Sequence, residues 1–368
     1  MTGGIETGSL TELVQGQGPF ASLSLDTRAD YEQAPKEIEL RWQAFRRDMA
    51  EAGAPEEVLS SIDDVVATAH QEGDGLVVLG RGDGIALKRN LATSIEEAGH
   101  WGPVPHLLPL LTWQQENPPY AVALVDRTGA EIEVTSSWRP ELSLEVDGDQ
   151  WPVRRINPGG WSQRRYQKRA ENLWEENAKD VAAALEKIAA DDDIDLVVLS
   201  GDVRAVAFLK DNLPDSFSPT IYEIEGTQAQ SVDEISEEIN KVVVTHEGQA
   251  TEALLERFRE ERGQADQAVE GVGRTARALS EARLHTLILA ADADERSAFV
   301  VAEDPTQVAT DRQALDDLGL GRVVEVPLRD ALVRSALAGG SAVRLVPALS
   351  ADHGPADGVG GILRYTYR

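Results

Sequence analysis

Short β-type runs alternate with helical segments through the last third of this chain. The runs are rich in aliphatic residues and lie at 286–290, 298–301, 323–326 and 342–346. Such alternation is typical of an α/β domain, in which helices cover the faces of a sheet. Two charged helices are expected before it, at about 232–262 and 264–282. The pattern restricts this region to an α/β architecture.

The first two thirds of the chain also mix strand and helix patterns. Alternating or apolar runs predict strands, helical spacing of apolar residues predicts helices, and the glycine-rich turn at 81–84 predicts a hairpin. The expected strands lie at 21–25, 75–80, 85–88, 120–125, 131–134 and 194–200, and the expected helices at 38–51, 165–190 and 203–212. The whole chain is therefore expected to be α/β, in the sense of an α+β multidomain protein.

The length and two breaks in the pattern indicate the domain organisation. At roughly 100–200 residues per domain, 368 residues correspond to two or three domains. The segment 114–119 contains two prolines and breaks any regular pattern, and a second change lies near Gly226. We expect an N-terminal α/β domain at 1–117, a middle domain at 118–228 and a C-terminal α/β domain at 229–368.

The composition excludes several classes of protein. The chain has no cysteine, which removes disulfides, thiolate zinc sites and cysteine nucleophiles and fits a reducing cytoplasm. It has no apolar run of the roughly 18 residues that a membrane helix needs, and its first residues do not read as a signal peptide. We therefore expect a cytoplasmic chain with no membrane partner.

Positive charge is concentrated in one window of a strongly acidic chain. The formal net charge is −29, yet residues 150–170 contain no acidic residue. Aromatic residues are interleaved with the basic ones, and such a mixture can neutralise phosphates and stack on bases. The alternative is a basic loop that is only solvated. The basic residues are Arg154, Arg155, Arg164, Arg165, Lys168 and Arg169, and the aromatic ones Trp151, Trp161 and Tyr166.

Conventional catalytic signatures are absent from the sequence. It contains no phosphate-binding loop, no H-E-x-x-H and no G-x-S-x-G. The six histidines have no ligand-like spacing and are expected to be surface or packing residues, and the acidic run 191–193 reads as a solvated turn. We therefore expect no metal and no cofactor.

The run that starts at Gly159 and Gly160 is the most specific motif. Trp161 and Ser162 follow the two glycines, and then come a basic cluster and a long predicted helix. The run resembles the middle domain of the archaeal and eukaryotic release factor and Pelota superfamily, in which a Gly-Gly-Gln loop precedes a small residue, basic residues and a helix. The resemblance implies a ribonuclease-H-like middle domain whose loop reaches the peptidyl transferase centre, where glycines permit close approach.

The end of the chain carries a second resemblance. The run 358–365, Gly-Val-Gly-Gly-Ile-Leu-Arg-Tyr, is similar to the closing strand of the superfamily's third domain. That domain contacts a translational GTPase in Pelota and the release factors, which implies elongation factor Tu or another such GTPase as a partner. The opening run 18–23 and the three-part layout resemble actinobacterial members of the bacterial branch, which includes the ribosome hibernation factor Balon.

The residue after the two glycines departs from the superfamily's pattern. In release factors that glutamine helps to place the water that attacks the peptidyl-tRNA ester, whereas Trp161 offers a bulky indole with a single donor. No catalytic residue is expected in this slot. Gln163 lies two residues further on, and a slightly different loop spacing, as in a rescue branch of the superfamily, would present it instead.

Three functions remain open at this point. The first is a non-hydrolytic hibernation factor that acts as a monomer and binds the A site of the 70S ribosome, with contacts to rRNA and tRNA. The second is a peptidyl-tRNA hydrolase for ribosome rescue that uses Gln163. The third is a scaffold redeployed away from ribosomes, which the acidity keeps open. The expected ribosome-binding residues are Gly159, Gly160, Trp161, Ser162, Gln163, Arg164, Arg165, Lys168, Arg169, Arg154 and Arg155.

Overall fold

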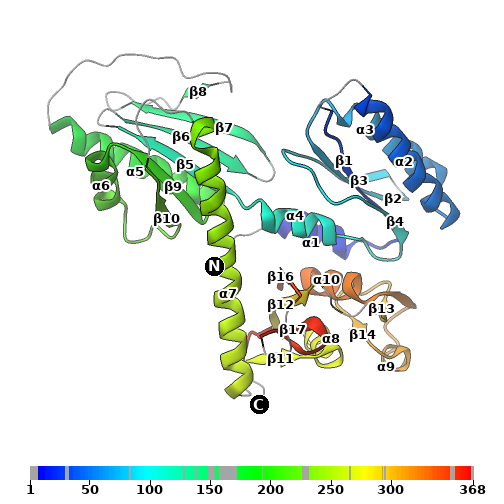
Figure 1. Ribbon diagram of the computed structural model, residues 1–368. Coiled ribbons are helices and arrows are strands. Elements are labelled where there is room, and N and C mark those ends of the chain that lie inside the picture. The colour runs from blue at the N-terminus through cyan, green and yellow to red at the C-terminus, as the bar shows by residue number, and fades with distance from the viewer. Residues whose placement is uncertain are drawn as a thin grey trace. The chain divides into compact units, whose positions relative to one another are not determined.

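The computed structural model has a mixed α/β, multidomain fold (Figure 1). It divides into two compact units, one containing Glu116–Gln249 and the other containing Ile5–Gln115 with Ala250–Arg368. We call these the middle unit and the terminal unit. The structure describes residues 7–29, 33–82, 84–126, 129–136, 139–147, 154–156, 172–192, 194–225, 232–264, 267–291, 293, 296–348 and 353–365.

The middle unit is built on a six-stranded sheet of order β10-β9-β5-β6-β7-β8. Neighbouring strands from β5 to β8 pair antiparallel, whereas β9 joins β5 in parallel and β10 joins β9 in parallel. The strands are β5 (Tyr120–Val125), β6 (Gly129–Ser136), β7 (Arg139–Asp147), β8 (Arg154–Ile156), β9 (Leu196–Gly201) and β10 (Thr220–Glu223). The two parallel strands β5 and β9 thus lie inside the sheet, each with a neighbour on both sides.

Helices cover both faces of this sheet. On one face α5 (Asn172–Asp191) and α6 (Val203–Asn212) bury side chains such as Leu185 and Leu209. On the other, η1 (Val232–Ile235) and the first half of α7 (Ser236–Gln264) pack on Val122 and Val198. Because β5 and β9 are buried on both sides, they are continuous apolar runs rather than alternating ones.

The N-terminal part of the terminal unit is an antiparallel sheet with two helices. Its order is β3-β2-β1-β4, and α2 and α3 pack on one face through Ile38, Trp42 and Ile62. The Trp42 indole donates to a carboxylate oxygen of Asp63 at 2.6 Å, so both helices share one core. The elements are β1 (Phe20–Asp26), α2 (Ala34–Glu51), α3 (Glu56–Ala69), β2 (Gly75–Arg81), β3 (Gly84–Leu91) and β4 (Ala98–Gly102).

The C-terminal part of the terminal unit contains two smaller sheets. The first has the order β11-β17-β12-β16 and the second the order β14-β13-β15. Their strands are β11 (Ala268–Glu270), β12 (Leu284–Ala290), β13 (Ser297–Val301), β14 (Val308–Ala309), β15 (Val323–Pro327), β16 (Ala342–Val346) and β17 (Val359–Leu363). The helices are α8 (Val272–Ser280), α9 (Arg312–Asp316), α10 (Leu328–Ala338) and η2 (Ala356–Gly358).

A buried arginine connects distant segments within the terminal unit. Arg334 of α10 is 1% exposed and donates to the carbonyl oxygens of Val14, Val301 and Ala302 at 3.2–3.4 Å. Burial lowers the pKa of its guanidinium to about 10, so it stays charged at neutral pH. Val14 belongs to α1 (Thr7–Gln15), and α4 (Leu108–Glu116) ends the N-terminal part of the unit. Arg334 therefore links α1 and β13 to α10 by hydrogen bonds.

Most of the predicted elements are confirmed. The runs expected at 75–80 and 85–88 form the hairpin of β2 and β3, and the helix expected at 203–212 is α6 with the same bounds. The helix expected at 165–190 is α5, which begins at Asn172; residues 165–171 lie outside the described residues. In the described part of the chain, no helix is long and apolar enough to cross a membrane.

The helix predicted at 264–282 is wrong over its first part. Residues Ala268–Glu270 form β11, which pairs antiparallel with Gly360–Ile362 of β17. Gly271 follows with a φ of +80°, which a helix interior does not allow, and α8 begins only at Val272. The strand was missed because three residues carry no periodicity and their partner lies at the far end of the chain.

Gly248→Ala is expected to stabilise α7. Gly248 lies inside this helix, is exposed, and has open space where a Cβ would be placed. Alanine is favoured over glycine in a helix interior by about 1 kcal/mol. Hydrogen exchange of the neighbouring α7 amides should slow by about fivefold, the factor that corresponds to that energy. Faster exchange in the variant would show that the glycine is needed in this conformation.

Candidate functional site

The predicted ribosome-binding segment is attached to the middle unit at both ends. Arg154 and Arg155 lie in β8, where they pair in register with Glu145 and Leu144 of β7. β8 is the edge strand of the sheet and ends at Ile156. The other predicted residues lie outside the described residues; they are Gly159, Gly160, Trp161, Ser162, Gln163, Arg164, Arg165, Lys168 and Arg169.

The chain re-enters the middle unit through α5. This helix begins at Asn172 and packs on the sheet with Val181, Leu185 and Ile188, each less than 9% exposed. Residues 157–171 are thus bounded by an edge strand and by a helix anchored in the core of the same unit. Binding residues are often found on segments that a packed scaffold supports at both ends.

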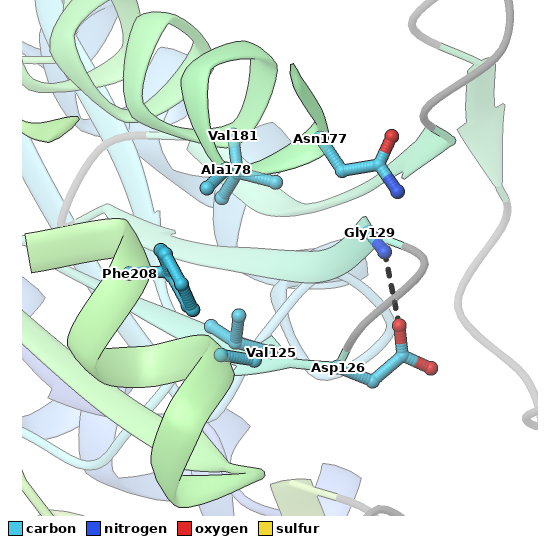
Figure 2. Close-up of a pocket in the computed structure, with 8 residues that line it drawn as sticks. Val125, Asp126, Gly129, Asn177, Ala178, Val181 and Phe208 are labelled. Carbon is cyan, nitrogen blue, oxygen red and sulfur yellow. Dashed lines mark hydrogen bonds between the residues drawn. The ribbon is translucent and has the colours of Figure 1, made fainter. Parts of the chain in front are cut away.

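A small pocket lies beside the first half of α5 (Figure 2). It has mostly apolar walls, with Asp126 and Asn177 as its polar residues, and Figure 2 shows Phe208 of α6 facing Val125 across it. The enclosed volume is about 10 Å³, which is room for about one water molecule. It is too small for a substrate. The lining residues are Val125, Asp126, Gly129, Asn177, Ala178, Val181, Ala205 and Phe208.

The carboxylates at the carboxyl ends of β5 and β9 have structural partners. Asp126 closes the turn to β6, because its carboxylate accepts from the Gly129 N–H at 2.9 Å and its own N–H donates to the Gly129 carbonyl at 2.9 Å. Asp202 caps α6 by accepting from the N–H groups of Arg204 and Ala205 at 3.0 and 3.1 Å. The carboxyl ends of parallel strands often carry catalytic groups. Here Asp126 and Asp202 at these ends instead stabilise a turn and the start of α6.

Gly201 allows these two strand ends to meet. Its φ is +133°, and a Cβ at this position would overlap the carbonyl oxygen of Val125. The next residue, Asp202, donates its N–H to the same carbonyl at 3.0 Å. A glycine is therefore required where β9 ends against β5. Among the described residues, no group of three or more Asp, Glu or His side chains is arranged to hold a metal ion.

The glycines of the C-terminal motif have packing roles in β17. A Cβ on Gly360 would lie 2.6 Å from the Cβ of Pro355 and 2.8 Å from the Val269 carbonyl oxygen. A Cβ on Gly361 would overlap the Thr286 carbonyl oxygen of the neighbouring strand. Both positions thus require glycine, because β11, β12 and the segment before β17 approach the backbone too closely for a side chain.

The last residues of the motif hold the strand end in place. The Arg364 guanidinium donates to the carbonyl oxygens of Leu284, Gly339 and Gly340 at 2.9–3.0 Å. The Tyr365 ring centroid lies 5.8 Å from the guanidinium carbon of Arg283. The contacts described for this run bind β17 to β12 and to the end of α10.

One ion pair was not foreseen from the sequence. His106 Nδ1 lies 2.9 and 3.1 Å from the two carboxylate oxygens of Asp330, whose side chain is only 4% exposed. The two residues are 224 positions apart in the chain, so spacing in the sequence gave no signal. His106 thus packs within the terminal unit, as expected for a histidine of this chain, but in an ion pair.

Part of the chain matches a known protein family. Residues 119–264, which contain the sheet of the middle unit and α7, match the family model described as bacterial archaeo-eukaryotic release factor family 2. A relative from Mycobacterium tuberculosis, "Uncharacterized protein Rv2629", is 27% identical over 373 residues, which cover 96% of this chain and 95% of the relative.

Solved structures of translation factors are also similar to this chain, at low sequence identity. The archaeal translation termination factor aRF1 is 15% identical, with 98% of this chain and 97% of that chain covered and a TM-score of 0.24. Pelota of Archaeoglobus fulgidus is 15% identical, with 80% of each chain covered and a TM-score of 0.31.

The fold defines a mixed α/β, multidomain protein whose middle unit supports a glycine-containing basic segment between β8 and α5. That same region of the chain is similar to bacterial archaeo-eukaryotic release factor family 2.

Proposed function

We propose that this protein binds the A site of the 70S ribosome without releasing the nascent peptide, and silences translation as a hibernation factor. The observation that carries the proposal is Trp161, which follows Gly159 and Gly160 where a hydrolytic release factor has glutamine. This run lies within residues 119–264, the region that matches the release factor family model. In this proposal a release factor-like region brings the chain to the ribosome, and Trp161 is unsuited to hydrolysis.

The chemistry of the indole supports the non-hydrolytic assignment. A glutamine amide offers two donors and an acceptor with which a water molecule can be oriented, whereas an indole has one N–H donor and no acceptor. Its bulk also fills the volume that an attacking water would need. In a glycine-bounded, basic segment, Trp161 is suited instead to stacking on a base.

The charge distribution supports an oriented encounter with RNA. The net charge of −29 makes most of the surface repel phosphates, while residues 150–170 carry six basic residues and no acidic one. The acid-free window is therefore the part of the chain that approaches rRNA, and its arginines hold phosphates. The acidic remainder disfavours non-specific binding to other nucleic acids.

The other parts of the chain receive roles within this proposal. The N-terminal domain, residues 1–117, faces the decoding centre, and the middle domain, residues 118–228, carries the ribonuclease-H-like scaffold and the segment that points to the peptidyl transferase centre. The C-terminal domain, residues 229–368, contacts elongation factor Tu or another translational GTPase. The protein works in the cytoplasm as a monomer, with rRNA and tRNA as its contacts on the ribosome.

Co-sedimentation with ribosomes tests the binding half of this proposal. Purified full-length chain is expected to pellet with 70S ribosomes through a sucrose cushion, and less of it when the salt concentration rises, because phosphate contacts release counterions. In cells of the source organism it should occur in the 70S fraction after cold shock or in stationary phase. Complete absence from the pellet, at every salt concentration and growth phase, would contradict the proposal.

A second candidate function is peptidyl-tRNA hydrolysis in ribosome rescue. Gln163 favours it, because this amide lies two residues after Trp161 and inside the same acid-free window. If the chain is a hydrolase, it frees labelled peptide from stalled ribosome complexes and Gln163→Ala abolishes the release. The hibernation proposal predicts the opposite result, namely background release by both the wild type and the variant.

A further inference from the structure

His100, His106 and Asp330 form a cluster within the terminal unit where its N-terminal part meets α10. His100 lies in β4, His106 follows that strand, and Asp330 lies in the first turn of α10. The two imidazole ring centroids are 6.1 Å apart. The cluster thus connects the sheet β3-β2-β1-β4 to a helix from the C-terminal part of the same unit.

His106 is held from two sides. Its Nδ1 lies 2.9 Å from Asp330 Oδ1, and its backbone N–H donates to Ser22 Oγ of β1 at 3.0 Å. Asp330 is 3% exposed, and its carboxylate lies near the N-terminus of α10, where a helix favours negative charge. Protonated His106 therefore completes a charged hydrogen bond in a place of low exposure, and neutral His106 weakens it.

His100 is in the opposite situation. Its Nε2 is buried and has no hydrogen-bond partner, and it packs against Gly102, where a Cβ would overlap this nitrogen. A proton on that nitrogen would be an unsatisfied buried donor with a charge, which is costly. The cluster thus contains one histidine whose surroundings favour the charged form and one whose surroundings favour the neutral form.

We propose that this cluster is a pH-responsive joint, which fastens the N-terminal sheet to α10 most firmly at slightly acidic pH and loosens at higher and at lower pH. His106 with Asp330 supplies the loosening at higher pH, and His100 supplies it at lower pH. The inference concerns the terminal unit alone and is independent of the proposed ribosomal function.

The direction of the pKa shifts agrees with the geometry. For His106, burial alone lowers the pKa, but the hydrogen bond and charge of Asp330, with a contribution from Glu96, raise it above the ordinary 6.5 in spite of the nearby Arg329. For His100, burial and the charge of His106 lower the pKa below 6.5, against the attraction of Asp330. These charged groups come from the segment before β4, from β4 and the segment after it, and from α10.

The sign of the pH dependence follows for each histidine. The stabilisation from His106 is fully present below the unfolded-state value of 6.5 and is lost as the pH rises through its raised folded pKa. For His100 the folded state prefers the neutral form, so its stabilisation is present above 6.5 and is lost as the pH falls towards its lowered folded pKa. Fastening is therefore maximal near pH 6.5.

Hydrogen exchange of the full-length chain tests the joint. After correction for the intrinsic rate, amides of β4 and of α10 are expected to open least near about pH 6.5 and more often on both the acidic and the basic side, because the pKa of His100 is lowered and that of His106 is raised in the folded chain. His106→Gln should remove the rise on the basic side, and His100→Gln the rise on the acidic side. His70→Gln, at the C-cap of α3 and outside the cluster, is the matched control and should keep both rises.

Two results would overturn the joint. The first is a wild-type opening equilibrium of β4 and α10 that does not change with pH. The second is a pH profile that keeps both rises in the double variant His100→Gln with His106→Gln. NMR titration of the histidine ring protons gives a further check that does not depend on stability, because Asp330→Asn should lower the measured pKa of His106.

Discussion

Gly201→Ala is expected to unfold the middle unit at temperatures where the wild type is fully folded. The new Cβ would overlap the carbonyl oxygen of Val125, which is backbone and cannot rotate away, and the φ of +133° is strained for alanine. Strain of the backbone alone costs about 1–3 kcal/mol. Separating β5 from β9 also disturbs two largely buried interior strands of the sheet, so a total loss above about 4 kcal/mol is expected.

Urea unfolding followed by circular dichroism and by hydrogen exchange measures this loss. The exchange data should show that protection is lost in β5, β9 and α6, whereas the sheet of β1 to β4 keeps its protection. Gly82→Ala is the matched control, because Gly82 is exposed with open space around it, and the variant should behave like the wild type. Wild-type stability of the Gly201→Ala protein would mean that β9 ends in a different conformation.

Reversing the charge of four basic residues in the acid-free window is expected to abolish tight ribosome binding. The variant carries Glu at Arg164, Arg165, Lys168 and Arg169. Each lost phosphate contact reduces the slope of the logarithm of affinity against the logarithm of salt concentration by roughly one. The reversed charges also repel the phosphates. At low salt the Kd should rise by about 100-fold or more. The fold should be unaffected, because the core of the middle unit is formed by other residues.

A variant with the same change in net charge separates this effect from general repulsion. Arg47, Lys241, Arg257 and Arg274 are exposed residues on three helices outside the window, and their replacement by Glu lowers the net charge equally. This control is expected to bind with nearly the wild-type Kd at moderate salt. Equal weakening by both variants would show that the window has no special role and that only the total charge matters.

Local patterns predicted the elements whose stabilisation is local. The helix α6 was predicted at 203–212 because its apolar residues have helical spacing, and Asp202, which caps it, precedes it directly. The strands β5 and β9 were predicted from their continuous apolar runs. In these cases the residues that decide the conformation are neighbours in the chain.

Features set by distant partners were not predictable. β11 exists because Ala268–Glu270 pair with Gly360–Ile362, and no periodicity in three residues indicates this. The His106–Asp330 pair likewise depends on how β4 and α10 meet within the terminal unit. Gly201 could be recognised as a glycine at a strand end, but the carbonyl of Val125 that requires it comes from another strand.

The candidate site also combines locally determined features with features set by distant partners. Its chemistry is local in the sequence, because the glycines, Trp161, Gln163 and the basic residues all lie within residues 154–169. Its support is not, because β8 is placed by pairing with β7 and α5 by packing on strands before and after it. The assignment of binding residues thus stays a prediction from the sequence, and the structure identifies the edge strand β8 and the helix α5 that flank residues 157–171.

A peptide-release measurement at known occupancy is the most direct test of the account. Ribosomes carrying labelled peptidyl-tRNA in the P site and an empty A site are incubated with saturating full-length chain, and bound chain and free peptide are measured in the same sample. We predict that the ribosomes are occupied and that the peptide stays on its tRNA at the background rate. Release above background by the wild type, lost in Gln163→Ala, would contradict the account and identify the protein as a hydrolase.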